Sequence, residues 1–508
     1  MLARVRSSAV LGVTAVPIEV EVDASAGMPH VNLVGLASSA VQEAKVRVQA
    51  AVRNVGVKLP EKRVTINLAP ADLRKQGTSF DLPIAVALLA ACDEIPPAAL
   101  EGIHFVGELS LSGALKGIRG ALAHAIEARR AGARGLVLPE ASAAEAAIVQ
   151  GLPVHPARHF GEVVAWARGT SPLPAHVPLE APSDDGPPLD LADVAGQEHA
   201  RRALEVAAAG GHNLLFFGPP GSGKTMLARR IAGILPPLSF EEALEATVVH
   251  SVAGLAPRRG LLAARPFRAP HHSVSDAGLV GGSAELRPGE VSLAHHGVLF
   301  LDELPEFRRH VLDALREPIE EGEVWIVRAA RSVRFPAQCT LVAAMNPCPC
   351  GWYGDARREC RCTMHALHRY RTHLSGPLVD RFDLHVDVPA VPPEVLAATR
   401  EPERSESVRA RVCAARALQA ARAAASERAG LPVVNARLRG SALRLHCALD
   451  AGGRALLASA AEKLGLSARG HDRILRVART IADLAGSEAI RPVHLAEAVQ
   501  YRALDRRA

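Results

Sequence analysis

The sequence predicts an α/β protein built around a parallel sheet, followed by a helical C-terminal domain. Three observations predict this fold class. Between about 189 and 393, short apolar runs alternate with helical patterns, as in a parallel sheet covered by helices. A glycine-rich loop directly follows one of these runs. Beyond 394, alanine, leucine and arginine recur at helical spacing.

The composition is that of an ordinary globular protein. The 508 residues are 48% hydrophobic and 22% charged, which excludes a disordered or fibrous chain and leaves room for roughly three domains. The net charge of +6 is a mild indication of a polyanionic partner. We find no secretory signal and no apolar run of membrane-spanning length, so we expect a cytoplasmic protein without a membrane partner.

Shifts in composition divide the chain into an N-terminal domain (1–168), a linker (169–188), a core (189–393) and a C-terminal domain (394–508). The linker is rich in proline and glycine and has no apolar period. The C-terminal domain holds 20 Arg and Lys against 12 Asp and Glu, so it carries the positive excess of the chain. Solvated helix faces explain this charge as well as a binding surface does.

A phosphate-binding loop follows the apolar run 213–217. Its spacing is Gly-x4-Gly-Lys-Thr, and a helical pattern continues from Met226, which is the context that this motif requires. Its glycines let backbone N–H groups face a phosphate, the lysine reaches the β- and γ-phosphates, and the threonine binds Mg²⁺. We therefore predict an ATP and Mg²⁺ site at Gly218, Pro219, Pro220, Gly221, Ser222, Gly223, Lys224 and Thr225.

Two further strand ends carry polar side chains suited to this chemistry. The apolar run 298–301 ends in Asp302 and Glu303, which we expect to hold Mg²⁺ and to orient the attacking water, respectively. Alone, such a pair is more often a helix cap or a solvated turn. The run 339–345 ends in Asn346, which is either a contact of the γ-phosphate or lytic water or a turn residue.

Together these motifs resemble the AAA+ ATPases. The resemblance places Arg381, just before the apolar run 384–388, where the arginine finger reaches into a neighbouring subunit. It also makes Arg469, at the start of a C-terminal helix, similar to the lid arginine that senses γ-phosphate. The alternatives are a surface ion pair for Arg381 and an ordinary helix-start residue for Arg469.

Longer segments at 268–282, 288–297, 300–307 and 346–354 resemble the magnesium-chelatase-like branch of these ATPases and, within it, the ComM (YifB) family. The resemblance covers nearly the whole chain. It implies a homo-hexameric ring that hydrolyses ATP and moves along single-stranded or branched DNA, with branch migration in recombination and natural transformation as the expected activity.

A hairpin pattern gives the DNA expectation a physical basis. Two strand-like segments, 324–327 and 332–335, flank a turn that carries Arg328 and Arg331. By resemblance such a hairpin enters the central pore of the ring, where repeated arginines would contact phosphate oxygens. The alternative is an outward turn with solvated arginines.

Four cysteines crowd into the segment 346–365. Cys348, Cys350, Cys360 and Cys362 have the spacing C-x-C-x9-C-x-C, which can close a tetrahedral structural zinc site. The spacing is tighter than the usual C-x2-C, and His365 is an alternative ligand. Free thiols packed in a loop are the other interpretation.

The N-terminal domain resembles the α+β proteolytic domain of Lon. That resemblance places Ser79 at the nucleophile, but the lysine of the Ser-Lys dyad falls on Leu122, and Lys116 lies six positions earlier. Leucine cannot accept a proton, so we predict no intact dyad and a scaffold role in ring assembly or DNA handling. Two alternative functions stay open. The shared ATPase core would suit a motor subunit of a magnesium-chelatase-type metal insertase, and the Lon-like domain would suit, less favourably, an ATP-dependent protease.

Overall fold

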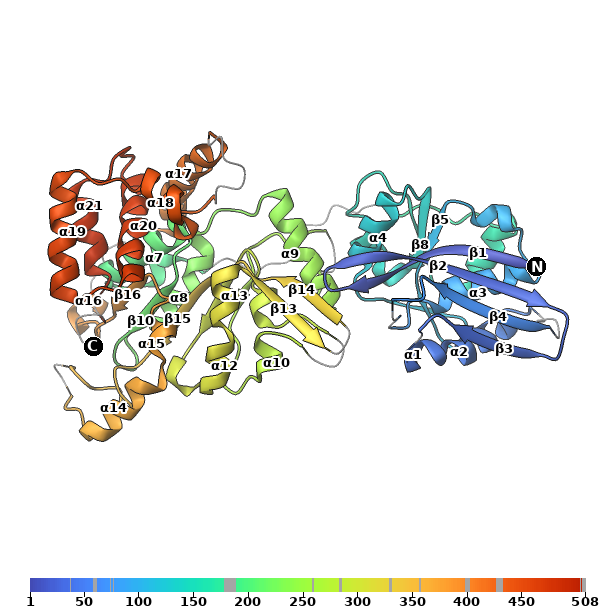
Figure 1. Ribbon diagram of the computed structural model, residues 1–508, viewed down its shortest axis with the longest axis horizontal. Coiled ribbons are helices and arrows are strands. Elements are labelled where there is room, and N and C mark those ends of the chain that lie inside the picture. The colour runs from blue at the N-terminus through green and yellow to red at the C-terminus, as the bar shows by residue number, and fades with distance from the viewer. Residues whose placement is uncertain are drawn as a thin grey trace.

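The structure is a computed structural model, in which three regions lie in a row (Figure 1): an N-terminal domain, a central parallel sheet and a bundle of C-terminal helices. It describes residues 1–36, 38–57, 62–73, 75, 77–177, 189–257, 260–282, 286–328, 331–355, 358–397, 403–425, 433–502 and 504.

The N-terminal domain is built on a mixed seven-stranded sheet with the order β3-β4-β2-β1-β5-β8-β9. The long strands β1 and β2 are antiparallel, whereas β5, β8 and β9 run parallel. A small ribbon, β6–β7, stands beside the sheet. The strands are β1 (Leu2–Leu11), β2 (Thr14–Ser25), β3 (His30–Val34), β4 (Arg63–Ala69), β5 (Ile103–Phe105), β6 (Glu108–Leu109), β7 (Leu115–Lys116), β8 (Gly135–Pro139) and β9 (Val154–Ala157).

Helices cover both faces of this sheet. One face packs on α2, α3 and α6, and α3 is buried along its whole length because all its side chains but Asp81 are apolar. The other face packs on α4 and α5. The helices are α1 (Ser39–Gln42), α2 (Ala44–Asn54), α3 (Asp81–Ala91), α4 (Ala121–Arg130), α5 (Ala143–Ala146) and α6 (Phe160–Ala167), with short 3-10 turns at Pro97–Leu100 and Glu140–Ser142. The domain is thus α+β, whereas its likeness to Lon stays a prediction.

The central sheet has five parallel strands in the order β11-β12-β15-β10-β16. The strand predictions at 213–217, 298–301, 339–345 and 384–388 are confirmed. The inner strands β10 and β12 consist of apolar residues only and are buried along their whole length, because helices cover both sides of a parallel sheet. The strands are β10 (Leu214–Phe217), β11 (Phe267–Arg268), β12 (Val298–Leu301), β15 (Thr340–Met345) and β16 (Leu384–Asp387).

Alternate side chains of these strands enter two separate cores. Leu214 and Phe216 pack with α7, α8 and the C-terminal helices, whereas Leu215 and Phe217 pack with α11, α12 and the inner face of the β-hairpin. The helices of this region are α7 (Glu198–Gly210), α8 (Lys224–Ile234), α9 (Phe240–Ala253), α10 (Asp276–Leu279), α11 (Glu290–Leu293), α12 (Arg309–Ala314), α13 (Arg316–Glu321), α14 (Met364–His373) and α15 (Gly376–Val379), with 3-10 turns at Leu191–Asp193 and Leu304–Glu306.

Beyond 393 the described chain is helical, as predicted. The amphipathic helix α20 lays Ile474, Val477 and Ile481 into the same core as the central strand β10, so this bundle packs directly on the sheet. Its helices are α16 (Pro393–Ala397), α17 (Ser405–Ala424), α18 (Gly440–His446), α19 (Ala451–Leu464), α20 (Ala468–Leu484) and α21 (Pro492–Gln500), with a 3-10 turn at Asn435–Arg437.

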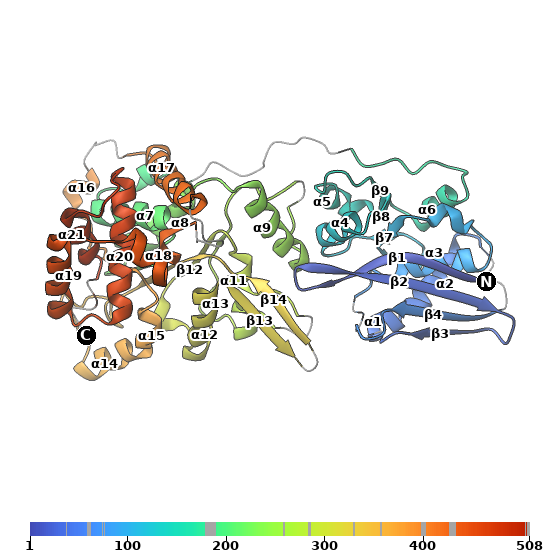
Figure 2. The same cartoon turned by 45° about the horizontal axis from the view of Figure 1, so that its top comes forward.

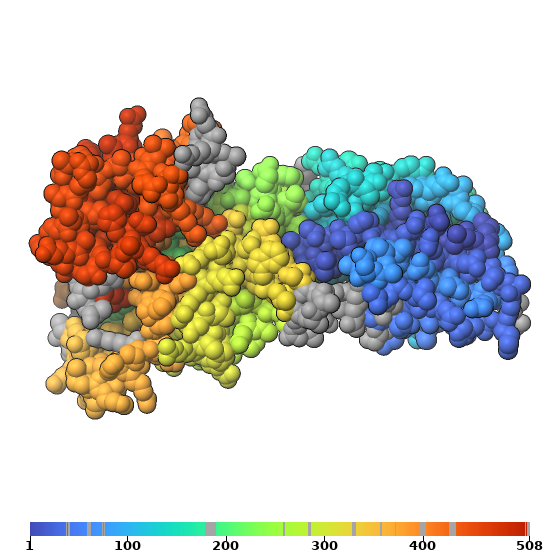
Figure 3. All heavy atoms as spheres, viewed as in Figure 1, coloured from blue at the N-terminus to red at the C-terminus, as the bar shows by residue number. Residues whose placement is uncertain are grey.

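The predicted hairpin is present as a separate two-stranded ribbon of β13 (Glu323–Arg328) and β14 (Arg331–Pro336). Figure 2 shows it standing apart from the central sheet, beside the N-terminal domain. The β1–β2 turn rests on it: a Cβ on Gly12 would lie 2.7 Å from a methyl group of Val333. Helix α9 completes the junction, because the Ser251 hydroxyl donates to the Glu145 carboxylate. The space-filling view shows the two regions meeting there (Figure 3).

Part of the linker prediction lies outside the described residues, since 178–188 are not described. The preceding residues 172–177 have no regular secondary structure. Within the described part of the chain, no helix is both long enough and apolar enough to cross a membrane.

Candidate nucleotide site and its surroundings

The phosphate loop connects the central strand β10 to helix α8. Gly221 and Gly223 have φ angles of +74° and +94°, which glycine adopts without strain. Gly218 is needed for a different reason: a Cβ there would lie 2.1 Å from the carbonyl oxygen of Val388. The loop therefore passes so close to the end of β16 that only glycine fits.

Lys224 lies buried inside this loop. Its Nζ donates to the carbonyl oxygens of Gly218 (2.7 Å) and Pro219 (2.8 Å) and to Oδ1 of Asn346 (3.2 Å). Burial lowers the pKa of the ammonium to about 8, and the carboxylate of Asp302 opposes this shift. The fold thus brings Lys224 and Asn346 together, although they are 122 positions apart, and the role of Asn346 towards a phosphate stays a prediction.

The carboxylate predicted to hold Mg²⁺ also meets its partner. Parallel pairing of β12 with β15, and of β15 with β10, aligns the carboxyl ends of these strands with the phosphate loop. The Thr225 hydroxyl donates to Oδ2 of Asp302 over 2.7 Å. A hydroxyl beside a carboxylate is a donor set that suits Mg²⁺, so Thr225 and Asp302 fit the predicted metal site.

Glu303 extends beyond this pair. Its backbone is left-handed (φ +51°), and 58% of its side chain is exposed. Its carboxylate lies beside His272, whose Nδ1 is 3.7 Å from a Glu303 oxygen. His272 was not predicted as a site residue, although it lies in the segment 268–282, which resembles the magnesium-chelatase-like ATPases.

Arg381 is not free to reach another subunit in this structure. Its side chain is only 10% exposed, and NH2 forms an ion pair with Glu320 of α13 over 2.9 Å. Its other N–H groups donate to the carbonyl oxygens of Arg316 and Pro377. An arginine finger at this position must exchange Glu320 for a phosphate.

The remaining predicted arginines lie away from the phosphate loop. Arg469 is exposed in the first turn of α20, with no bond to the loop among the described residues. Arg328 and Arg331 pair with each other across the end of the hairpin. Their side chains and the turn residues 329–330 lie outside the described residues.

The four cysteines of the segment 346–365 converge. The Sγ atoms of Cys348, Cys350 and Cys360 lie 3.4–3.7 Å apart, and Cys362 completes a group within 4.8 Å. A tetrahedron of thiolates around zinc has edges of about 3.8 Å, so the set fits the metal. His365 is not a member of this group.

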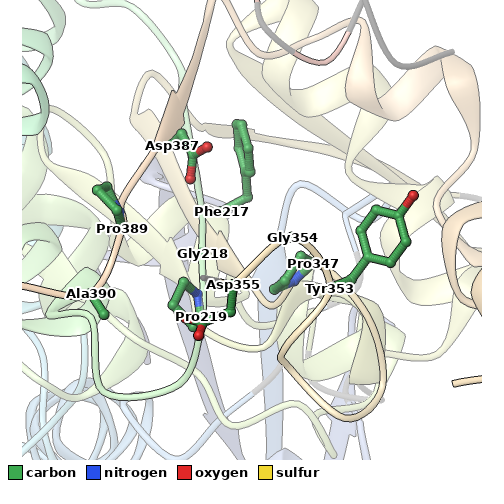
Figure 4. Close-up of a pocket in the computed structure, with 10 residues that line it drawn as sticks. All are labelled: Phe217, Gly218, Pro219, Pro347, Tyr353, Gly354, Asp355, Asp387, Pro389 and Ala390. Atoms are coloured by element: carbon green, nitrogen blue, oxygen red, sulfur yellow. The ribbon is translucent and has the colours of Figure 1, made fainter. Parts of the chain in front are cut away.

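This cysteine loop packs against the phosphate loop. A Cβ on Gly351 would lie 2.5 Å from the ring of Pro220. Beside this contact, a cavity of about 210 Å³ separates Gly218 and Pro219 from Tyr353 and Asp355 of the cysteine loop, with Asp387 on a third side (Figure 4). The cysteine loop therefore forms one wall of the cavity beside the phosphate loop.

A second group of possible metal ligands, Glu245, His295 and His296, is better explained by hydrogen bonds. The N–H of Gln338 donates to Nδ1 of His295, so Nε2 of that ring carries the proton and donates to Glu245. Burial, with His296 beside it, lowers the pKa of His295 to about 3. A neutral ring protonated at Nε2 has no lone pair there for a metal.

The segments that resemble the Ser-Lys dyad of Lon lie on different elements of the N-terminal domain. Leu122 is fully buried in α4, and no side chain hydrogen-bonds the Ser79 hydroxyl among the described residues. Lys116 lies on β7, 4.0 Å from Glu108, which accepts a hydrogen bond from Thr78. This places Lys116 nearer to the serine segment than its sequence position suggests.

The parallel sheet with its phosphate loop, the adjacent Thr225–Asp302 and Lys224–Asn346 pairs, and the helical bundle define a P-loop ATPase of the AAA+ class. Comparison with known families agrees. Residues 190–396 match the family described as magnesium chelatase, subunit ChlI, and 402–502 match its C-terminal domain. Residues 20–142 match a family described as subunit ChlI of Mg-chelatase.

Full-length relatives narrow the class. The chain is 46% identical over 506 residues to the uncharacterized protein YifB of Salmonella typhimurium (99% of this chain, 98% of the relative). It is also 46% identical over 510 residues to the competence protein ComM of Haemophilus influenzae, with the same coverage. The magnesium-chelatase 38 kDa subunit of Rhodobacter capsulatus is 28% identical over 222 residues (40% of this chain, 56% of the relative). The chain belongs to the ComM/YifB family of magnesium-chelatase-like AAA+ ATPases.

Proposed function

We propose that this chain is the subunit of a homo-hexameric ring that couples ATP hydrolysis to movement on single-stranded or branched DNA, and that it acts in the cytoplasm as a branch-migration factor. The observation that carries the ATPase part is the convergence of Lys224, Thr225, Asp302 and Asn346 at one edge of the sheet. The DNA part is supported by the similarity to a competence protein and by the arginines at the hairpin end.

In this proposal the residues have distinct tasks. Lys224 and Asn346 bind the terminal phosphates of ATP, and Glu303 orients water for attack. Mg²⁺, held by Thr225 and Asp302, supplies charge neutralisation of the phosphate oxygens. Arg381 completes the site of the neighbouring subunit, and Arg469 contacts the nucleotide when the helical bundle closes. The cysteine loop binds one structural zinc ion through Cys348, Cys350, Cys360 and Cys362.

The test measures ATP turnover and unwinding of a branched DNA junction on the same sample. We expect DNA to stimulate turnover and ATP to drive unwinding. Glu303→Gln should retain ATP binding while it loses turnover by at least about 100-fold, because the water is no longer oriented.

Replacing both Arg328 and Arg331 by alanine should weaken DNA binding and flatten its salt dependence, since fewer counterions are released.

A second candidate is the motor of a metal insertase. It is favoured by the partial similarity to the magnesium-chelatase 38 kDa subunit. It predicts an ATPase that DNA neither stimulates nor binds, and this result would contradict the DNA-motor proposal. An ATP-dependent protease requires a base beside Ser79. Labelling of Ser79 by a serine-reactive probe would support this alternative.

A further inference from the structure

The β13–β14 hairpin has one buried and one exposed face. Val324, Ile326, Val333 and Phe335 point into the core below the sheet. The other face presents Trp325, which is 53% exposed, and Val327, which is 71% exposed. Only 3% of the residues are aromatic, and the hairpin uses one of three tryptophans at a position where it buries little surface. Because Trp325 and Val327 lie two positions apart, they share one face of the ribbon and together form an exposed apolar patch, which makes this face a candidate binding surface.

A cation lies directly beside the tryptophan. Trp325 and Arg334 are register partners across the ribbon. Glu323 holds both side chains: its Oε1 accepts from the indole N–H over 2.6 Å, and its carboxylate forms an ion pair with the Arg334 guanidinium. The polar edge of the indole is therefore fixed. No other ring and no cation stacks on it among the residues that the structure describes.

The charge of the ribbon favours a polyanion over an apolar protein surface. Residues 323–336 contain three arginines and one glutamate, and two of the arginines occupy the end of the hairpin next to Val327. An aromatic face flanked by arginines is the combination with which proteins bind single strands, because bases stack on the ring while cations contact phosphates.

We propose that Trp325, Val327 and Arg334 form a stacking platform for unpaired DNA bases. One base stacks on the indole of Trp325 and its neighbour packs against Val327, while Arg334 exchanges part of its contact with Glu323 for a backbone phosphate. This inference rests on the proposed DNA function and deepens it. In these two proposals the arginines at the hairpin end bind phosphates and are indifferent to the bases, whereas the platform binds the bases.

The test compares binding of two single strands by the full-length protein. One is an oligothymidylate of about 20 nucleotides, and the other is a strand of equal length and charge without bases. Trp325→Ala should weaken binding of the oligothymidylate by about 5- to 100-fold and leave binding of the abasic strand unchanged, while Trp325→Phe should retain most of the affinity. Phe240→Ala is the matched control, because Phe240 is an aromatic residue that is 57% exposed on α9.

Two further measurements separate stacking from a structural role. A protein with Trp166→Phe and Trp352→Phe keeps Trp325 as its single tryptophan, and the oligothymidylate should quench its fluorescence. Arg334→Gln should reduce the slope of log affinity against log salt by about 0.7, as expected for one lost phosphate contact to a single strand. Arg158→Gln, which also breaks an exposed pair with one glutamate, is the control.

The outcomes distinguish the two proposals. If the unmodified protein binds the oligothymidylate but Trp325→Ala binds it as tightly as Phe240→Ala, the proposed stacking platform is wrong and the proposed DNA motor is unaffected. If Trp325→Ala lowers subunit assembly in light scattering while DNA affinity is unchanged, the face is a contact between subunits instead. If the unmodified protein binds no DNA, both proposals fall.

Discussion

At the scale of single residues, buried polar groups form hydrogen bonds with partners that are distant in sequence. Lys224 is an example, since its ammonium is bound by two carbonyl groups of its own loop and by Asn346. In the N-terminal domain, Ser8 lies 2.9 Å from Nε2 of His104 and 2.7 Å from Nδ1 of His124. All three are buried, so the two imidazoles are kept neutral in the core.

This histidine pair makes stability depend on pH. Burial lowers the pKa of His104 to about 4 and that of His124 to about 3. The unfolded chain binds protons near pH 6.5 and the folded chain does not, so stability is full above that pH and is lost as the pH falls towards 4 and 3. At pH 5 we expect each histidine to lower the free energy of unfolding by about 2 kcal/mol.

Urea unfolding at pH 7.5, 6 and 5 measures this loss. Trp166 reports on the domain, because its ring lies 6.4 Å from Phe105, the neighbour of His104. It becomes the single tryptophan when Trp325 and Trp352 are replaced by phenylalanine. His124→Asn should reduce the steepness of the pH dependence, whereas replacement of His471, whose side chain is 46% exposed on α20, should not. A pH dependence that is the same in all three proteins would contradict the assignment.

At the scale of elements, the cysteine loop contains no helix or strand among its described residues before α14 and yet contacts the phosphate loop. The loop begins just after Asn346, at the end of β15, and returns to helix α14. In between, Gly351 rests on Pro220 of the phosphate loop. Without metal, four thiols at this separation do not hold a loop in one conformation, whereas a zinc ion does.

We therefore predict one zinc ion per chain and a coupling of zinc to nucleotide binding. Cys348→Ser or Cys360→Ser should lose the metal and weaken binding of a non-hydrolysable ATP analogue by about 10-fold, because the cysteine loop that packs on Pro220 would no longer be held in one conformation. Metal analysis and titration of the analogue measure the two effects. Cys92→Ser, which changes a separate thiol in the N-terminal domain, should change neither. A zinc-free variant with normal nucleotide affinity would disprove the coupling.

At the scale of the whole molecule, the site is incomplete in a single chain if Arg381 acts in its neighbour. Glu320 holds the guanidinium inside its own subunit. In the proposed ring two states would compete, since the arginine is either bound to Glu320, as here, or extended towards a neighbouring nucleotide. Contacts formed on assembly would then have to offset the loss of this ion pair.

The competition predicts opposite effects for the two partners. Arg381→Ala should lower turnover by about 1,000-fold, because the charge that stabilises the transferring phosphoryl group is lost. Glu320→Gln should raise turnover a few-fold at subunit concentrations near assembly, since the arginine is released more easily. Turnover against protein concentration, together with sedimentation, checks both effects, and Glu321→Gln on the same helix is the control.

A purely structural Arg381 would behave differently. Both Arg381→Ala and Glu320→Gln would then lower thermal stability, and neither would raise turnover. A protein that stays monomeric and hydrolyses ATP at full rate would also exclude the role in a neighbour. Partial rescue of Arg381→Ala by unmodified protein would support it, because mixed rings contain some complete sites.

Much of the ATPase domain could be predicted from the sequence because its signals are local. The strand 214–217, the phosphate loop and helix α8 are consecutive, and apolar runs that end in Asp302 or Asn346 identify strand ends directly. The cysteine cluster was predicted in the same way, from spacing alone. The seven-stranded order of the N-terminal sheet could not be predicted, because distant segments pair in it.

The sequence by itself determined the class of this protein, since the phosphate loop, the carboxylates after β12 and the family segments are readable without coordinates. Only the tertiary structure decided which groups meet: Arg381 with Glu320, Glu303 with His272, Gly351 with Pro220, and Trp325 with Arg334 on one exposed face. The physical reason is that local sequence sets backbone conformation, whereas contacts between distant side chains depend on how layers pack.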